Sequence, residues 1–248
     1  AMDSSKVIVK PNVYSWRNST VSNMFKTAYN YNRELDSHMM KNTEWGAVSY
    51  LSHSKYGINT EVRINNNSNY LTGYSAVEGT DQSSYPGTYG PDSTKTLPYN
   101  TETGYKASTT GNITGIYDMS GGAWEYVAAY MPSSSDASGF SASELTTYSK
   151  YLDLYSANST INSYNNRKLG DATGEMGPFY FYADKDNNKR YHNNCYGDNS
   201  LFVDSTNPWF HRGGNYGYGV LAGQFSFARG TGGVGTIGGS RLVFAAKI

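Results

Sequence analysis

Two segments decide the fold of this 248-residue chain, and the first is Asn112-Ile113-Thr114-Gly115-Ile116-Tyr117-Asp118-Met119-Ser120-Gly121-Gly122-Ala123-Trp124-Glu125-Tyr126. The second begins with Arg212-Gly213-Gly214-Asn215-Tyr216 and continues with Phe227-Ala228-Arg229 and Gly239-Ser240-Arg241-Leu242-Val243. Each alternates glycines with aromatic and charged residues. Because both occur in one chain and in this order, the pair is more specific than either segment alone.

The first segment resembles the pattern N-x-x-G-x-x-D-M-x-G-N-V-W-E-W of the formylglycine-generating-enzyme (sulfatase-modifying-factor) family, and the second resembles that family's R-G-G-S-[WF], R and G-F-R-L-V positions. The resemblance implies an α+β, C-type-lectin-like fold with a small twisted antiparallel sheet, two main helices and extensive ordered loops. It implies that Met119 and Trp124 are core anchors and that Glu125 satisfies backbone donors or a structural cation. The residues that carry the motif mark the fold and not a site: Gly115, Asp118, Met119, Gly121, Trp124, Glu125, Arg212, Gly213, Gly214 and Arg241.

Hydrophobic periodicity predicts few helices and short strands. Val21, Met24, Phe25 and Ala28 recur at helical spacing behind a Ser or Thr cap, which predicts a helix over 19–30. Further helices are expected over 42–52, where Trp45, Val48 and Leu51 would share a face, and over 141–149. Strands are expected over 224–228 and 240–244, joined by the glycine-rich stretch 230–239 as a hairpin connection.

The composition favours a recognition protein over a nucleic-acid or membrane protein. Lys plus Arg equals Asp plus Glu at 20 each, so net charge indicates neither nucleic acid nor an anionic membrane as a partner. No apolar run approaches the roughly 20 residues of a membrane span. The 24 tyrosines and 27 glycines suit a loop-rich binding surface, since Tyr provides a large contact area at low entropic cost. The alternative interpretation of this composition is a loop-rich globular domain with Tyr in its core.

The residues argue against an enzyme of the family. Its catalytic members resemble copper-dependent oxidases that need a pair of thiolates after the R-G-G segment, because soft sulfur ligands hold Cu(I). Here residues 212–225 contain no cysteine. The single cysteine of the chain, Cys195, lies upstream, and we interpret it as a buried or incidental thiol. We therefore expect no enzyme activity and no cofactor, although the loops leave room for a structural calcium or magnesium ion.

Other catalytic sites have little support. Residues 205–248 contain no Asp or Glu, so this stretch cannot supply a carboxylate dyad or a hard-metal cage by itself. The only histidine cluster worth naming is His192 near Asp184, Asp186 and Cys195, and it reads as a solvated loop.

The C-terminal stretch instead favours a display surface over about 209–243. Glycine and aromatic positions would hold a scaffold, and the residues between them have no evident folding role. In 224–228 the two phenylalanines would face the core and the other three side chains would face outward. The predicted ligand-binding residues are Tyr216, Tyr218, Val220, Leu221, Gln224, Ser226, Ala228, Thr231, Val234, Thr236 and Ile237, with Trp209 and Phe210 at the edge.

This layout resembles the variable proteins of diversity-generating retroelements, which include phage tropism determinants. In those proteins the R-G-G-containing segment is rewritten at adenines of Asn-type codons, and most residues above are reachable that way; Gln224 is not. The resemblance implies a protein or glycan ligand on a cell surface, a phage tail tip or bacterial surface location, no nucleic-acid partner and no membrane insertion, and it is compatible with an oligomer. We expect one domain over 1–248, alone or as the C-terminal domain of a longer protein.

Two alternatives stay open. The chain would be an invariant structural or adhesive module of a phage tail or bacterial surface if its C-terminal codons do not vary. An enzyme on the same fold would need a cleft lined by titratable groups from 30–60 or 170–200. A calcium-bridged sugar site on the C-terminal surface is disfavoured, because that surface has amides but no carboxylates.

Overall fold

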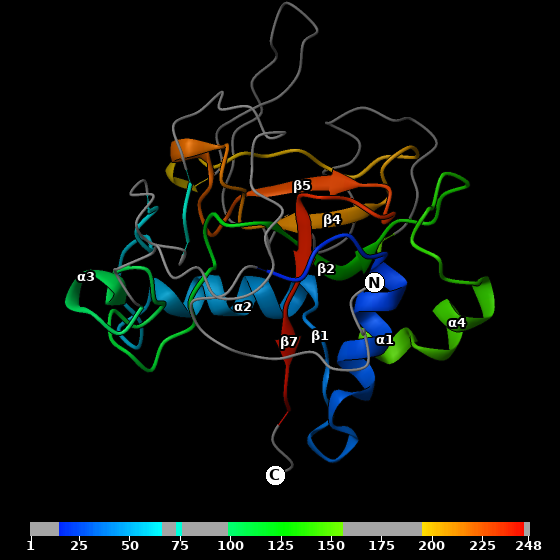
Figure 1. Ribbon diagram of the computed structural model, residues 1–248, viewed down its shortest axis with the longest axis horizontal. Coiled ribbons are helices and arrows are strands. Elements are labelled where there is room, and N and C mark those ends of the chain that lie inside the picture. Colours follow the sequence, from blue (N-terminus) through cyan, green and yellow to red (C-terminus); the bar gives the residue numbers. More distant parts are fainter. Residues whose placement is uncertain (1–14, 66–72, 76–98, 156–194, 246–248) are drawn as a thin grey trace, which may run out of the picture.

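The computed structural model describes residues 15–65, 73–75, 99–155 and 195–245 as a mixed α+β structure. Its two main helices are α1 (Val21–Tyr31) and α2 (Asn42–Ser52), and shorter ones are α3 (Glu102–Tyr105) and α4 (Ala142–Thr147). The α+β class and the two main helices are thus as predicted. Figure 1 shows β4 and β5 side by side with opposite directions, and β7 leading away toward the C-terminus.

Helix α1 forms where its apolar periodicity predicts it. The Thr20 hydroxyl accepts the Asn23 amide at 3.2 Å, which satisfies one of the free N–H groups of the first turn. Val21, Met24, Phe25 and Ala28 are all buried, which confirms the predicted face.

Helix α2 has the predicted bounds but a different buried face. Trp45 is fully buried, whereas Leu51 is 58% exposed, so the expected Trp45–Leu51 face is wrong. The buried residues instead follow helical spacing from the first residue, namely Asn42, Trp45, Gly46, Ser49 and Ser52. A six-residue step turns the side chain about 120° away from the starting face, which explains the exposure of Leu51.

The larger sheet is mixed and not purely antiparallel as expected. Its centre is β2 (Trp124–Tyr130), which pairs antiparallel with β4 (Trp209–Arg212) and parallel with both β3 (Asp153–Leu154) and β6 (Gly238–Ser240). Strand β5 (Phe227–Gly230) pairs antiparallel with β4. A small antiparallel sheet joins β1 (His38–Met39) to β7 (Leu242–Val243).

The glycine-rich stretch after β5 is not a hairpin. Strand β5 lies beyond β4, whereas β6 pairs with β2, so the two strands do not pair with one another. The segment between them crosses the sheet, and β6 therefore runs parallel to β2. The expected strands also move, from 224–228 to 227–230 and from 240–244 to 238–240 and 242–243.

The two faces of β2 carry the core. Tyr126, Ala128 and Tyr130 pack on one face with α1 and Trp209, and Val127 and Ala129 pack on the other with Trp45 of α2. This alternation follows the two-residue period of a strand. Met119 and Trp124 are also buried, as predicted for core anchors.

The motif glycines and charges hold the C-terminal segment against this core. Gly214 has a φ of +70°, and an added Cβ would lie 2.4 Å from Ala222 Cα, so a side chain at this position would meet rigid backbone. Arg241 donates from Nε and Nη2 to the two carboxylate oxygens of Glu125, at 2.9 and 2.6 Å. Glu125 therefore pairs with Arg241, a partner that the sequence analysis did not name.

Candidate functional site

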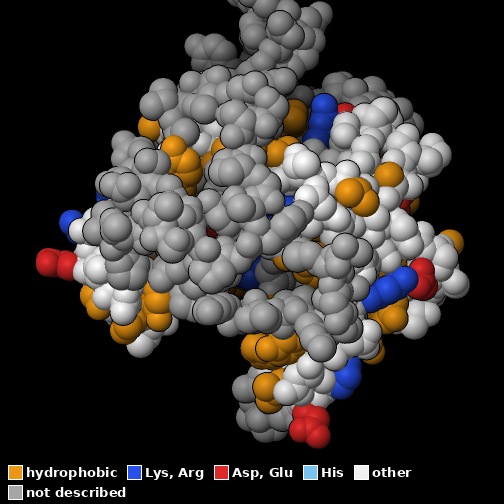
Figure 2. Space-filling view, viewed as in Figure 1, with side chains coloured by type: hydrophobic (Ala, Val, Ile, Leu, Met, Phe, Trp, Pro, Cys, Tyr) orange, Lys and Arg blue, Asp and Glu red, His pale blue; other side chains and the backbone are white. Residues whose placement is uncertain are grey.

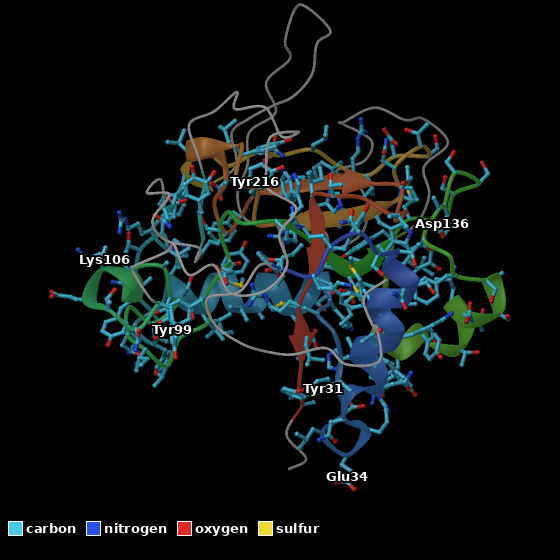
Figure 3. The ribbon with its side chains drawn as sticks, viewed as in Figure 1. Tyr31, Glu34, Tyr99, Lys106, Asp136 and Tyr216 are labelled. Carbon is cyan, nitrogen blue, oxygen red and sulfur yellow. The ribbon has the colours of Figure 1, made fainter. Side chains whose placement is uncertain are left out.

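The structure divides the eleven predicted ligand-binding residues into a buried and an accessible group. The predicted exposure is wrong for four of them, because the side chains of Tyr216, Gln224, Ser226 and Ala228 are at most 5% exposed. Tyr216, labelled in Figure 3, is only 3% exposed. Trp209 and Phe210, expected at the edge of the face, are fully buried in β4.

Gln224 connects the C-terminal segment to α2 through hydrogen bonds. Its amide Nε2 donates to Ser49 O at 3.1 Å and to Ser52 Oγ at 2.6 Å. Its backbone carbonyl accepts the Trp45 indole N–H at 2.8 Å. The alternation that placed Gln224 outward requires a strand, and β5 begins only at Phe227. Gln224 therefore lies in a turn whose side chains do not follow the two-residue period.

The other three buried residues also serve the scaffold. Ser226 accepts the Gly213 amide and Arg212 Nε at its carbonyl, at 3.1 and 3.2 Å. Ala228 pairs with His211 within the sheet, and the Tyr216 amide donates to Gly122 O at 2.8 Å. A change at any of these positions would therefore disturb packing before it altered a surface.

Seven predicted residues remain accessible, in two segments that flank β5. We call them the display set. The first segment lies at the 3-10 turn η5 (Gly219–Leu221), where Val220 is 72% exposed. The second is the β5–β6 loop, where Val234 is 68% exposed. Figure 2 shows exposed apolar side chains in separate groups on the viewed face. The display set is Tyr218, Val220, Leu221, Thr231, Val234, Thr236 and Ile237.

The η5 turn is held through its backbone. The Ser75 hydroxyl donates to Gly219 O at 3.1 Å, and the Asn199 amide donates to Leu221 O at 3.0 Å. The Ser120 hydroxyl donates to Ala222 O at 2.6 Å. Since these bonds reach carbonyl groups, the shape of the turn does not depend on the side chains of Val220 and Leu221.

The β5–β6 loop is held in the same way from the other end of the chain. The Val21 amide donates to Gly232 O, and the Asn18 amide donates to Gly235 O, both at 2.9 Å. Arg17 Nη1 donates to Thr236 O at 2.8 Å. Thr231, Val234 and Thr236 are exposed on this backbone. Both segments therefore present side chains from loops that are fixed by main-chain carbonyls.

Carboxylates from outside the acid-free stretch compensate its arginines. Arg229 pairs with Asp204, and Arg241 pairs with Glu125. Asp198 lies close enough to Arg212 for the positive charge to favour its ionised form. These acids belong to the scaffold and leave the display set uncharged.

Sequence reasoning missed a carboxyl pair formed by Glu61 and Asp198. The two side chains lie within hydrogen-bonding distance of each other, and Asp198 is fully buried. Burial raises the pKa of Glu61 to about 7, against the opposing effect of the hydrogen bond with Asp198. Burial and the nearby Glu61 raise the pKa of Asp198. The only signal in the sequence was that the acid-free stretch needed carboxylates from elsewhere.

The three histidines that the structure describes do not come together. His38 contacts Glu44 at 2.8 Å, His53 lies at the end of α2, and His211 lies inside β4. The expected cluster of His192, Asp184 and Asp186 lies outside the described residues, as does the side chain of Cys195. Within the described ranges no three His, Cys, Asp or Glu residues are placed to hold a metal ion.

Comparisons with known proteins assign no family to the chain. No model of a known protein family matches the sequence, and no curated protein is significantly similar to it. In the part of the chain that the structure describes, no helix has the length and apolar character needed to cross a membrane.

Proposed function

We propose that this chain is a receptor-recognition protein that binds a protein or glycan through the display set. The observation that carries the proposal is that the main-chain carbonyls of η5 and of the β5–β6 loop are held by partners outside these segments, while Val220 and Val234 remain largely exposed. Exposed apolar and Tyr side chains on an ordered backbone are typical of recognition surfaces. A preorganised loop also binds with a smaller loss of entropy.

The proposal includes diversification of the display set. Its members include Tyr, Val, Leu, Thr and Ile, which adenine replacement in Asn-type codons can produce, and the resemblance to variable proteins of diversity-generating retroelements is the basis for this step. The protein is then located on a phage tail tip or on a bacterial surface. Gln224, which that route cannot produce, lies outside the display set.

A pair of libraries tests the surface without knowledge of the natural ligand. One library randomises the seven display positions, and the matched control randomises the four buried positions 216, 224, 226 and 228. The clones are displayed on the surface of yeast and treated with protease. We expect most display-set clones to resist cleavage as well as the wild type, since a surface substitution alters the free energy of unfolding by about 0.5 kcal/mol. Most control clones should lose it, because changes at buried positions create cavities or unpaired polar groups.

Selection for binding completes the test. The display-set library should yield clones that bind new protein or glycan targets, and reverting Val220 and Val234 in these clones should abolish binding while folding is kept. Equal loss of folded clones in both libraries, or binders that tolerate reversion of every display position, would show that this surface is not the recognition site.

A further inference from the structure

Both nitrogens of the His38 ring face oxygen atoms, and the side chain is only 5% exposed. Nδ1 lies 2.6 Å from the backbone carbonyl oxygen of Asp36, and Nε2 lies 2.8 Å from Oε1 of Glu44. A carbonyl oxygen and an ionised carboxylate can only accept hydrogen bonds. Both contacts are therefore hydrogen bonds only when both ring nitrogens carry a proton, which is the charged form of the side chain.

The neutral ring carries a single proton and can satisfy only one of the two oxygens. With the proton on Nδ1, the lone pair of Nε2 faces the Glu44 carboxylate. With the proton on Nε2, the lone pair of Nδ1 faces the Asp36 carbonyl oxygen. Either form leaves two acceptors in contact at a buried position, where an unsatisfied polar group is costly. The site therefore favours the charged ring of His38.

The charge on Glu44 supports this assignment. Burial opposes ionisation of Glu44, but hydrogen bonds from His38 and from the Lys41 amide hold the pKa of this carboxyl below its ordinary value. The Lys41 amide donates to Oε2 at 2.9 Å, so Oε1 is left for the histidine. Burial also opposes the charge on His38, and the hydrogen bonds with Glu44 and with the Asp36 carbonyl outweigh it, so the pKa of His38 is raised from 6.5.

The other charges near His38 are paired. Strand β7, which pairs with β1, contains no titratable residue. Helix α1 contributes one charge, Lys26, and it pairs with Glu144. The Tyr151 ring lies beside the His38 ring, with centroids 5.5 Å apart. The remaining charged and titratable groups on the packed elements are bonded to one another, and they are Arg33, Asp36, Lys41, Lys150, Tyr151 and Asp153.

The turn that contains Asp36 also anchors the C-terminal strand. The 3-10 turn η1 (Arg33–Leu35) ends at Asp36, whose backbone has a φ of 49° and a ψ of 40°. A non-glycine residue keeps this left-handed conformation only where its surroundings hold it. The carbonyl of Leu35 accepts the Ala245 amide at 3.0 Å. Loss of the contact at the Asp36 carbonyl would therefore loosen the attachment of residues 242–245.

We propose that His38 is a pH switch for the attachment of the C-terminal strand: the charged ring ties the Asp36 turn to α2, and loss of its proton releases this tie. The direction follows from the acceptors on both sides of the ring. Because the pKa is raised above 6.5, the stability that His38 gives is fully present below pH 6.5 and is lost as the pH rises through the pKa of the folded state. The switch is independent of ligand binding by the display set.

The ring ¹⁵N resonances of His38 in the labelled full chain, followed from about pH 5.5 to about pH 9, test the switch. Two protonated nitrogens should be seen at low pH, and the titration midpoint should lie above 6.5. The Ala245 amide should be protected below this midpoint and exchange faster above it, after correction for intrinsic rates. The increase should reach about tenfold if the midpoint lies about one pH unit above 6.5, because the pKa and the opening of the turn are linked.

Glu44→Gln should reverse the preference of the ring. A glutamine at this position can accept the Lys41 amide through Oε1 and donate from Nε2 to the neutral His38 ring, whose Nδ1 proton stays on the Asp36 carbonyl. We expect the His38 midpoint to fall below 6.5 and the pH dependence of Ala245 exchange to disappear above it.

Glu144→Gln is the matched control, because Glu144 has the same capping position in α4 and its partner is Lys26 rather than a histidine. It should leave the His38 midpoint and the exchange of Ala245 at their wild-type values. A wild-type midpoint at or below 6.5, a midpoint that Glu44→Gln leaves unchanged, or Ala245 exchange that stays constant across the midpoint would overturn the switch. The wild-type titration decides alone if Glu44→Gln does not fold.

Discussion

Replacing Arg212 by Met is expected to lower the free energy of unfolding by about 3–5 kcal/mol, the range found when one partner of a buried charge pair is removed. The guanidinium is fully buried, donates to Asn42 Oδ1 at 2.7 Å and lies over the Trp45 ring. Met fills similar volume, so the loss reports the charge and its hydrogen bonds. It would leave the Asp198 carboxylate without its cation and Asn42 without its donor.

Arg229→Met is the matched control for this prediction. Arg229 lies on the neighbouring strand β5 and pairs with Asp204, but its side chain is 27% exposed, so water can replace part of the lost interaction. We expect a loss of about 1 kcal/mol. Urea unfolding of both variants at neutral pH measures the difference. Equal losses would mean that Arg212 does not anchor the segment to α2.

Acid is expected to destabilise the fold through His211, in a range where most carboxylates are still ionised. Burial lowers the pKa of His211 to about 3, from 6.5 in the unfolded chain. Its ring contacts Tyr126 and Trp124, with centroids 4.0 and 5.6 Å away. A lowered histidine pKa gives stability that is present above pH 6.5 and lost as the pH falls toward 3. The loss should reach about 1.4 kcal/mol per pH unit within this window.

His211→Gln tests this directly, because Gln does not titrate. We expect the variant to be less stable at pH 7, since it loses both ring contacts, and to show a much weaker dependence of stability on pH between 6.5 and 4 than the wild type. His53→Gln is the control, because His53 lies at the end of α2 and is only partly buried. A pH dependence that is unchanged in His211→Gln and removed in His53→Gln would contradict the assignment.

Local patterns predicted the helices well and the sheet only in part. The cap and spacing of 20–28 specify α1 without reference to the rest of the chain. The pairing of β6 with β2 has no local signal, because a glycine-rich segment is compatible with a tight hairpin and with a crossing between strands. Its course depends on contacts with residues 17–21, which are more than 200 positions away in the sequence.

The sequence predicted the exposed residues of the candidate site that lie in loops. It did not predict the residues whose exposure was inferred from the two-residue period of a strand. Val220 and Val234 had no folding role in the sequence, and they are exposed. Gln224 and Ser226 were placed outward by an alternation that needs a strand, and the chain is turning there. The carboxyl pair joins Glu61 to Asp198, and only the folded chain brings them together.

Sequencing of codons 209–243 across the source population, with codons 112–126 as an internal control, tests the central claim most directly. The display-set account predicts substitutions confined to adenine positions at residues 218, 220, 221, 231, 234, 236 and 237. It also predicts invariance at residues 216, 224, 226 and 228, which are buried. If codons 209–243 are as invariant as the control, the chain is not a diversified recognition protein, and a fixed adhesive or structural module accounts for it better.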